Sequence, residues 1–281
     1  MKRIDRRDAL QREVAAARTA GRRIALVPTM GYLHEGHLTL IDRAREVADV
    51  VVVSIFVNPL QFGPGEDFER YPRDIERDAL LAEARGTDLL FVPPTEGLYP
   101  AGEPGVYVVA PRLADRLCGA YRPGHFQGVL TVVAKLFNIV RPDIAVFGRK
   151  DFQQLVLVRR MAADLDFAVA IVEGPIVREP DGLAMSSRNV YLSEDERRDA
   201  TLLHAALEDA QRAFTAGERS ADALIATAAR RIEQGRHVQP QYIALVHPET
   251  LDPVQAARVG SVVALAGYVG KTRLIDNHAL S

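Results

Sequence analysis

The sequence predicts an α/β fold: a doubly wound, Rossmann-like and mostly parallel sheet, followed by a smaller α+β domain. Short apolar runs rich in β-branched residues alternate with amphipathic stretches between residues 24 and 172. This is the pattern of strands that are covered on both faces and joined by helices. Near residue 175 the alternation stops, and the chain ends in three strand-like runs without helices between them. We therefore expect two domains, one over residues 1–175 and one over residues 176–281.

The elements of the first domain can be assigned in order. Its expected strands are 24–27, 50–57, 89–92, 106–109, 144–147 and 168–172, and its expected helices are 5–20, 34–47, 72–85, 130–140 and a segment that ends near 163. Gly21 occupies the position after a helix that favours glycine. The loops 29–37, 58–65 and 148–151 all leave the carboxyl ends of expected strands. Doubly wound sheets bind their ligands at these ends, so we expect the three loops to converge.

The second domain begins with an irregular segment, residues 175–189, and continues with two helices and three strands. The helices are expected at 193–217 and 220–234, and the strands at 241–246, 261–266 and 272–276. Ser220 is a good N-cap for the second helix, because its hydroxyl can accept a hydrogen bond from a backbone N–H of the first turn. These elements indicate a small α+β domain.

The composition is that of an ordinary globular protein and excludes several classes. The 281 residues carry a formal net charge of −2, and no basic run is interleaved with aromatic residues, so we expect no nucleic-acid partner. The N-terminus lacks the apolar core of a signal peptide, and no apolar run is long enough to span a membrane, which favours a cytoplasmic protein without a membrane partner. The one cysteine, Cys118, excludes an intrachain disulfide and is expected as a small buried residue.

The segment V-P-T-M-G-Y-L-H-E-G-H, residues 27–37, is the centre of the expected site. A strand runs into Pro28, Gly31 allows the backbone to turn, and a helix pattern starts at about His34. A strand, a tight loop and a helix in this order point backbone N–H groups and the positive end of the helix dipole at an anion. His34 and His37 lie three residues apart on the first turn. Both imidazoles can therefore donate hydrogen bonds to the same phosphate.

Three other interpretations of these motifs are weaker. H-E-G-H resembles the zinc-protease signature, but its histidines are three residues apart instead of four and no third ligand is evident, so the ligands of any metal are unknown. G-Y-V-G-K-T at residues 267–272 is two residues too short for a Walker loop, and a loop before the last strand is the better interpretation. No G-x-G-x-x-G fingerprint is present, which argues against a dinucleotide oxidoreductase.

Three further loops carry polar side chains suited to a polyphosphate and an organic substrate. Residues 186–188, S-S-R, offer two hydroxyls and a fork of donors that suit a phosphate. Lys150 follows a strand in G-R-K-D, and Asn58 and Gln61 carry neutral amides that can orient a hydroxyl or a carboxylate. Each residue alone is unremarkable at a surface or in a turn. The prediction of a polyphosphate site therefore depends on their combination.

Five segments occur in an order and spacing that resemble the pantoate–β-alanine ligase (pantothenate synthetase) family. They are P-T-M-G-x-L-H-E-G-H, S-I-F-V-N-P-x-Q-F, H-F-x-G-V, G-x-K-D-x-Q-Q and A-M-S-S-R-N-x-Y-L. The similarity is specific from Ile24 to Leu192 and weaker beyond, where R-L-I-D-N at residues 273–277 also matches. The H-x-G-H and S-S-R elements resemble the wider nucleotidyltransferase superfamily, which includes class I aminoacyl-tRNA synthetases.

This resemblance implies a two-step ligase reaction. The carboxylate of (R)-pantoate attacks the α-phosphorus of ATP to give pantoyl adenylate and pyrophosphate, and the amine of β-alanine then displaces AMP to give pantothenate. The resemblance also implies ATP as co-substrate, Mg²⁺ on the phosphates and a homodimer. The second domain is then expected to act as a lid that carries the S-S-R loop over the reactive intermediate.

The same resemblance implies roles for individual residues. His37, at the position usually assigned as proton donor, is expected in catalysis together with His34, Lys150, Ser186 and Arg188. The nucleotide site is expected to include Met30, Gly31, Tyr32, Leu33, His34, Glu35, Gly36, His37, Gly148, Arg149, Lys150, Asp151, Val177, Met185, Ser186, Ser187 and Arg188. The pocket for pantoate and β-alanine is expected to include Asn58, Gln61, His125 and Gln154.

One residue departs from the family pattern, because Arg149 stands where the family usually has glutamate. Arg149 either points to solvent or adds a cation near the nucleotide, and it is expected outside the catalytic set. Two other functions compete with ligation: transfer of a nucleotide that stays in the product, and nucleotide sensing without chemistry. Nucleotide transfer would give a stable nucleotide adduct, whereas ligation gives free AMP.

Overall fold

The computed structural model describes all 281 residues, and the chain divides into two compact units. The first unit consists of Met1–Asp115, Gly119–Arg149 and Leu157–Pro175, and the second consists of Arg116–Cys118, Lys150–Val156 and Ile176–Ser281. The second unit therefore takes in two short segments that precede residue 176. One of them begins at Lys150, shortly after the end of β5.

The first unit is built on a six-stranded sheet with the strand order β1-β4-β3-β2-β5-β6. All of its pairings are parallel, which confirms the predicted doubly wound sheet. The strand order reverses between β2 and β5, and this switch point is where such sheets bind ligands. The strands are β1 (Lys2–Ile4), β2 (Ile24–Thr29), β3 (Val50–Ile55), β4 (Leu89–Phe91), β5 (Ile144–Gly148) and β6 (Ala170–Gly174).

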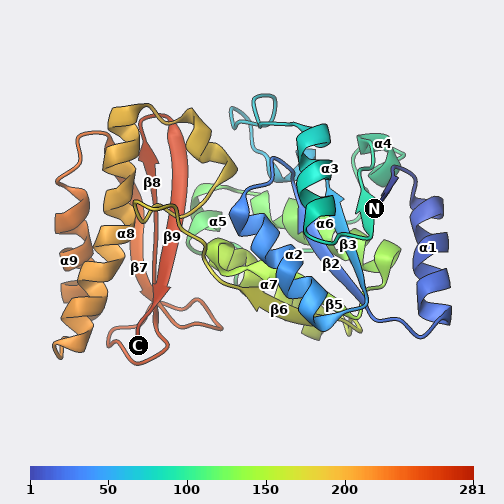
Figure 1. Cartoon of the computed structure of the whole chain (residues 1–281). Coiled ribbons are helices and arrows are strands. Elements are labelled where there is room, and N and C mark those ends of the chain that lie inside the picture. The colour runs from blue at the N-terminus through green and yellow to red at the C-terminus, as the bar shows by residue number, and fades with distance from the viewer. The chain divides into compact units, whose positions relative to one another are not determined.

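Helices cover both faces of this sheet (Figure 1). One core joins α2 to the alternate strand residues Ala25 and Val27, while their neighbours Ile24 and Leu26 are fully buried on the opposite face. The helices are α1 (Arg7–Thr19), α2 (Glu35–Val47), α3 (Ile75–Ala84), α4 (Thr95–Leu98), α5 (Cys118–Tyr121), α6 (His125–Val140) and α7 (Phe152–Asp164), with the 3-10 segments η1 (Pro59–Gln61) and η2 (Arg149–Asp151).

The second unit is the predicted small α+β domain. Its sheet is antiparallel with the order β7-β8-β9, and both long helices pack on one face of it (Figure 1). Leu203, Leu224 and Leu265 are members of the single core that joins the helices to the sheet. The elements are η3 (Ser187–Tyr191), α8 (Glu194–Thr215), α9 (Ala221–Ile232), β7 (Val238–Val246), β8 (Val262–Val269) and β9 (Thr272–Ala279).

The end signals read from the sequence are present in the structure. Gly21 follows α1 with a left-handed φ of 71°, as expected for the residue after a helix. The Ser220 hydroxyl accepts a hydrogen bond from the Ala223 N–H at 3.4 Å and caps α9. At the start of α8, Ser193 and Glu196 form a reciprocal capping box.

Some expected elements need correction. Residues 106–109 form no strand, and Val106 and Val109 are 82% and 61% exposed, so their apolar character does not mark a buried element. Residues 130–140 belong to a helix, as expected, and this helix begins earlier, at His125. The short strand β1 was not predicted, because three residues carry too little periodicity to identify a strand. None of the helices is both long and apolar enough to cross a lipid bilayer.

Candidate active site

The loop after β2 turns sharply, and contacts with the neighbouring strand β3 fix this turn. Gly31 has a left-handed φ of 85°, and a Cβ at this position would lie only 2.8 Å from Cγ2 of Ile55, so glycine is required here. The Gly31 N–H donates to the Thr29 hydroxyl at 3.1 Å, and that hydroxyl donates to the Ser54 carbonyl at 2.9 Å. The sheet thus fixes the point at which the chain enters α2.

Asp78 of α3 also holds this turn, a role that was not predicted from the sequence. Its side chain is fully buried, and its two carboxylate oxygens accept hydrogen bonds from the N–H groups of Tyr32 at 2.6 Å and Leu33 at 2.7 Å. Burial raises the pKa of Asp78 above its ordinary value, although these hydrogen bonds and the charge of Arg77 act in the opposite direction. A single aspartate on an amphipathic helix gives no sequence signal that it turns inward.

The rings of His34 and His37 lie next to each other at the start of α2, with their planes tilted by 37°. Nδ1 of His34 accepts a hydrogen bond from the Gly36 N–H at 3.1 Å, and Nδ1 of His37 accepts one from the His34 N–H at 3.4 Å. Their ring centroids are 4.1 Å apart. A neutral imidazole that accepts at Nδ1 carries its proton on Nε2. The pair therefore has two Nε2–H donors beside the positive end of a helix dipole, an arrangement that suits phosphate oxygens.

Two other side chains of this loop have partners within the fold. Leu33 is fully buried in the core under α2. The carboxylate of Glu35 forms an ion pair at 2.7 Å with Arg85, the residue that follows α3. Neither side chain is therefore aimed at an anion, although both residues were predicted for the nucleotide site.

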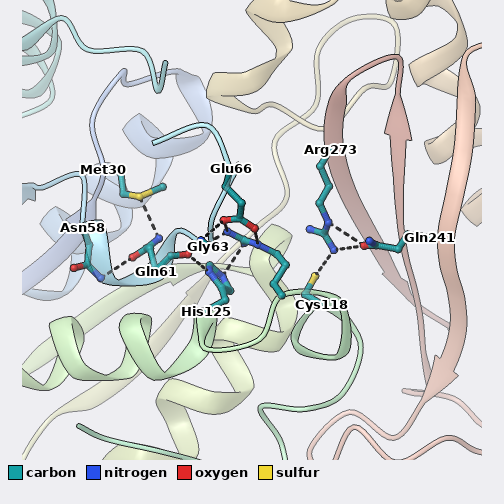
Figure 2. A network of polar contacts seen from close by, with 10 residues as sticks. Met30, Asn58, Gln61, Gly63, Glu66, Cys118, His125, Gln241 and Arg273 are labelled. Atoms are coloured by element: carbon teal, nitrogen blue, oxygen red, sulfur yellow. Dashed lines mark hydrogen bonds and ion pairs between the residues drawn. The ribbon is translucent and has the colours of Figure 1, made fainter. Parts of the chain in front are cut away.

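Asn58 and Gln61, in the loop after β3, form a buried pair of amides (Figure 2). Nδ2 of Asn58 donates to Oε1 of Gln61 and to the Gly128 carbonyl, both at 3.1 Å, and the Tyr99 hydroxyl donates to Oδ1 of Asn58 at 2.9 Å. Nε2 of Gln61 lies 3.2 Å from the sulfur of Met30. The structure therefore brings the two predicted amides together with Met30 of the first loop.

Two side chains contact the backbone carbonyl of Gln61: His125, which Figure 2 shows, and Arg122. Nδ1 of His125 lies 2.8 Å from the Gln61 carbonyl oxygen, and Nη2 of Arg122 donates to the same oxygen at 3.2 Å. Nη1 of Arg122 lies 3.0 Å from Nε2 of His125. Because arginine can only donate, the histidine accepts at Nε2, donates at Nδ1 and is neutral. His125, which was predicted to contact substrate, thus supports the loop that carries Gln61.

Glu66 completes this network from the same loop. Nε and Nη2 of Arg122 donate to its two carboxylate oxygens at 2.7 and 2.6 Å. Burial by itself raises the pKa of Glu66, but the hydrogen bonds and the charge of Arg122 outweigh burial and leave the pKa below its ordinary value. Neither Glu66 nor Arg122 was predicted from the sequence, because their ion pair joins segments that are far apart in the chain.

Arg149 follows Gly148 at the end of β5 and pairs with the neighbouring strand. Its Nη1 donates to Oε1 of Glu173 on β6 at 2.6 Å, and Arg159 of α7 lies 3.1 Å from the other carboxylate oxygen. The side chains of Arg149 and Glu173 are 26% and 27% exposed. The guanidinium of Arg149 is thus ion-paired at the carboxyl ends of β5 and β6.

The loops after β2, β3 and β5 leave the same edge of the sheet. These three strands are neighbours in the sheet and run parallel. Their carboxyl ends therefore lie side by side, and the predicted convergence of the three loops is confirmed as far as Arg149.

The remaining predicted residues belong to the second unit. Asp151 is exposed and Gln154 is half-buried at the start of α7. Backbone bonding between Met185 and Val177 closes a hairpin that leads into residues 186–188. There the Ser186 hydroxyl accepts a hydrogen bond from the Arg188 N–H at 3.2 Å and caps η3.

Lys150 and Ser186 lie close to each other within the second unit. Both line a cavity of about 10 Å³, the space of roughly one water molecule. The predicted lysine and serine, which are far apart in the chain, are therefore brought to one place together with β9.

A metal held by the protein does not fit the residues that are present. No group of three or more histidine, cysteine, aspartate or glutamate side chains could hold an ion. His34 and His37 use Nδ1 to cap the helix, and a structural or catalytic zinc site needs at least one further protein ligand.

The whole chain is similar to known ligases. The profile of the pantoate-β-alanine ligase family matches residues 2–279. A pantothenate synthetase of Geotalea uraniireducens is 54% identical over 280 residues, which is 100% of this chain and 99% of that protein. A pantothenate synthetase of Thermoanaerobacter sp. is 52% identical over 258 residues, 92% of this chain and 91% of that protein.

Two solved structures share the fold. The crystal structure of pantothenate synthetase from Thermus thermophilus has a TM-score of 0.94 and 46% sequence identity, and the match covers 99% of both chains. The pantoate-β-alanine ligase from Francisella tularensis, complexed with β-γ ATP and β-alanine, has a TM-score of 0.83 and 32% identity, with 99% of this chain and 97% of that chain covered.

Proposed function

The chain belongs to the pantoate–β-alanine ligase family, and we propose that its two groups of site residues share the work of that reaction. The enzyme condenses (R)-pantoate with β-alanine to give pantothenate, with conversion of ATP to AMP and pyrophosphate. In the first step the pantoate carboxylate attacks the α-phosphorus of ATP and forms pantoyl adenylate. In the second step the amine of β-alanine attacks the acyl carbon, loses a proton and releases AMP.

The paired imidazoles at the start of α2 are the observation that carries this proposal. Attack of one anion on another requires donors that offset repulsion and stabilise the charge that builds on the departing pyrophosphate. His34 and His37 carry their protons on Nε2 because Nδ1 of each ring accepts a backbone hydrogen bond. We assign both Nε2–H groups to oxygens of the triphosphate, with His37 as the proton donor.

The amides of Asn58 and Gln61 are proposed to hold pantoate. The pair is buried, with exposed fractions of 1% and 9%, so hydrogen bonds to a substrate form there without much competition from water. Gln61 Nε2 can donate to the pantoate carboxylate and orient it toward the α-phosphorus. Gln61 also serves β-alanine, and Gln154 supplies a further amide to pantoate. The network of Arg122, Glu66 and His125 keeps the backbone of Gln61 in place for this task.

Lys150, Ser186 and Arg188 are proposed to bind the triphosphate from the second unit. The ammonium, the hydroxyl and the guanidinium fork are donors that suit phosphate oxygens. Met185 and Val177 flank the S-S-R segment, and Asp151 is assigned to the ribose. Since acyl adenylates react with water, the second unit is also proposed to act as the lid that excludes water during the second step.

Mg²⁺ is proposed to accompany ATP rather than to occupy a site of protein ligands. Mg²⁺ commonly binds through substrate phosphates and keeps several waters, and the structure has no group of protein side chains suited to a metal ion. When bound to the phosphates, the ion supplies charge neutralisation. Removal of Mg²⁺ with EDTA should abolish turnover, and an excess of MgCl₂ should restore it.

We also propose that the protein acts as a homodimer in the cytoplasm. Light scattering after size-exclusion chromatography tests the dimer, because a monomeric mass at micromolar concentration would contradict it.

Product analysis by mass spectrometry tests the proposed function. With ATP, pantoate and β-alanine together, the enzyme should form pantothenate and free AMP in equal amounts. Omission of either organic substrate should prevent pantothenate formation. A stable nucleotide adduct as the final product would instead identify a nucleotidyltransferase, and binding of ATP without any product would identify a sensor.

A further inference from the structure

The segment R-L-I-D-N, residues 273–277, matches the family but has no role in the reaction described above. It lies on β9, an edge strand of the three-stranded sheet. Asp276 and Asn277 are adjacent in this strand and are only 4% and 2% exposed. Buried polar side chains need hydrogen-bond partners. Both residues have partners in segments that are far away in the sequence.

Asn277 contacts the loop that follows β5. Its Nδ2 donates a hydrogen bond to the carbonyl oxygen of Lys150 at 3.0 Å. This contact fixes the backbone from which the lysine side chain extends. Without the amide donor, the carbonyl loses this partner and the loop gains freedom to shift.

Asp276 contacts the hairpin that leads into the S-S-R segment. Its carboxylate accepts two hydrogen bonds from Arg178, at 2.6 Å from Nη1 and at 3.1 Å from Nη2. Arg178 also donates to the Gly182 carbonyl at 3.2 Å and forms a β-bridge with Ala184, so it belongs to the framework of the hairpin. The two charged side chains are 20% and 3% exposed, which limits screening of the pair by salt.

The two contacts meet at one small cavity. Its volume of about 10 Å³ holds roughly one water molecule. Its lining comes from the loop after β5, the hairpin, α8 and β9: Lys150, Leu183, Ala184, Ser186, Leu203, Leu274, Ile275 and Asp276. The segments that carry Lys150 and Ser186 are thus packed closely around β9, and adjacent residues of one strand hold both.

We propose that Asp276 and Asn277 are positioning residues that fix the spacing between Lys150 and the segment 186–188, and thereby set the affinity for the triphosphate of ATP. In this role each side chain acts through the loop that it holds and not through a contact with the substrate. A displacement of about 1 Å in such a group can lower a rate by roughly 10²-fold. The inference rests on the proposed function, because the spacing between Lys150 and residues 186–188 affects ATP binding only if these side chains bind the triphosphate.

Two single variants test the two contacts separately. Asn277→Ala removes the donor to the Lys150 carbonyl, and Asp276→Asn removes the charge that holds Arg178. Each should raise the KM for ATP by about 10-fold or more in pantoate-dependent pyrophosphate exchange, while the KM for pantoate stays within about twofold. Arg178→Gln should raise the KM for ATP as much as Asp276→Asn does. The double variant that combines these two changes should show no larger rise than either single variant, because both changes break the same contact.

His278→Asn is the matched control. His278 is the next residue on β9, and its Nε2 lies 3.1 Å from Oε1 of Gln211 on α8, away from both loops. This variant should leave the KM for ATP unchanged. A merely structural role for β9 would lower the melting temperature of all the variants without a selective rise in the KM for ATP.

The outcomes distinguish the inference from the function on which it rests. Absence of exchange in the unmodified enzyme would overturn both. If the unmodified enzyme exchanges and folded Asn277→Ala keeps a KM for ATP within about twofold of it, the inference is wrong and the ligase function stands. The Asn277→Ala variant decides the matter even if Asp276→Asn fails to fold, because it removes no buried charge.

Discussion

His37 uses its two ring nitrogens for different purposes. Nδ1 accepts a hydrogen bond from the backbone of His34 and helps to cap α2, so the proton of the neutral ring is on Nε2. The same bond fixes the ring orientation before any substrate binds. Preorganised donors of this kind need no rearrangement when charge develops on a leaving group.

Replacement of His37 tests this division directly. His37→Ala should lower the rate of adenylate formation by about 10²-fold or more, because it removes both the donor and the proposed acid. His37→Gln is the matched control: glutamine at this helix position can still cap the turn, so thermal stability should recover while much of the rate loss remains. Rapid-quench measurement of the first turnover gives the rate, and equal rates for all three proteins would contradict the assignment.

Glu66 gives the structure a pH dependence on the acid side. Its folded-state pKa lies below the ordinary value, because the bonds from Arg122 outweigh the effect of burial. A lowered pKa stabilises the native state above the unfolded-state pKa, and this contribution disappears as the pH falls through the folded-state pKa. The stability that Glu66 contributes through its ion pair with Arg122, beside Gln61, should therefore be lost in acid.

The variant Glu66→Gln removes this titration. Between about pH 6 and about pH 3, the free energy of unfolding should fall more steeply for the unmodified protein than for the variant. Urea denaturation at a series of pH values measures both curves. Parallel curves over this range would show that Glu66 contributes no pH-dependent stability.

Among the contacts between elements, the close approach of η1 to α6 sets the position of the loop that carries Asn58 and Gln61. A Cβ on Gly128 would lie 2.2 Å from the Leu60 carbonyl oxygen and 2.7 Å from the Gln61 nitrogen. Both are backbone atoms, so no side-chain rotation can relieve the overlap. The glycine of H-F-Q-G-V is thus required by packing, and the position of Gln61 depends on it.

Gly128→Ala should displace η1 and raise the KM for pantoate by about 10-fold or more, since the amides would move relative to the attacked phosphorus. The helix itself should remain, because alanine favours helix more than glycine does. Gly105→Ala is the matched control, as a Cβ there has no atom within 4 Å and the backbone is not left-handed. An unchanged KM for pantoate in Gly128→Ala would contradict this role of the glycine.

The carboxyl ends of β5 and β6 are joined by an ion pair between Arg149 and Glu173. Arg149→Glu would place two carboxylates together and should lower the free energy of unfolding more than Arg149→Gln does. Urea denaturation of both variants measures the difference, and equal stability would show that the pair contributes little.

Strands and motifs followed from the sequence, whereas contacts between distant segments did not. The β-branched runs at 24–27 and 50–57 identified buried strands because burial on both faces leaves a continuous apolar pattern. The exposed Val106 and Val109 gave the same local signal without the burial. Asp78 and Arg122 were missed, since their roles depend on partners that only the fold brings near. No local pattern reports such partners.

At the scale of the whole molecule, the predicted nucleotide residues are shared between two compact units. One segment of the first unit ends at Arg149, and a segment of the second unit begins at the next residue, Lys150. The placement of 150–156 with the second unit was not expected from the sequence, because nothing in G-R-K-D-F-Q-Q marks a change of unit.

The exchange of labelled pyrophosphate into ATP is the decisive measurement for a pantoyl adenylate, because it reports formation of the adenylate alone. We expect exchange that requires pantoate, proceeds without β-alanine and falls by about 10²-fold or more in His37→Ala. Exchange that ignores pantoate, or that occurs only when β-alanine is added, would contradict a pantoyl adenylate formed at this site.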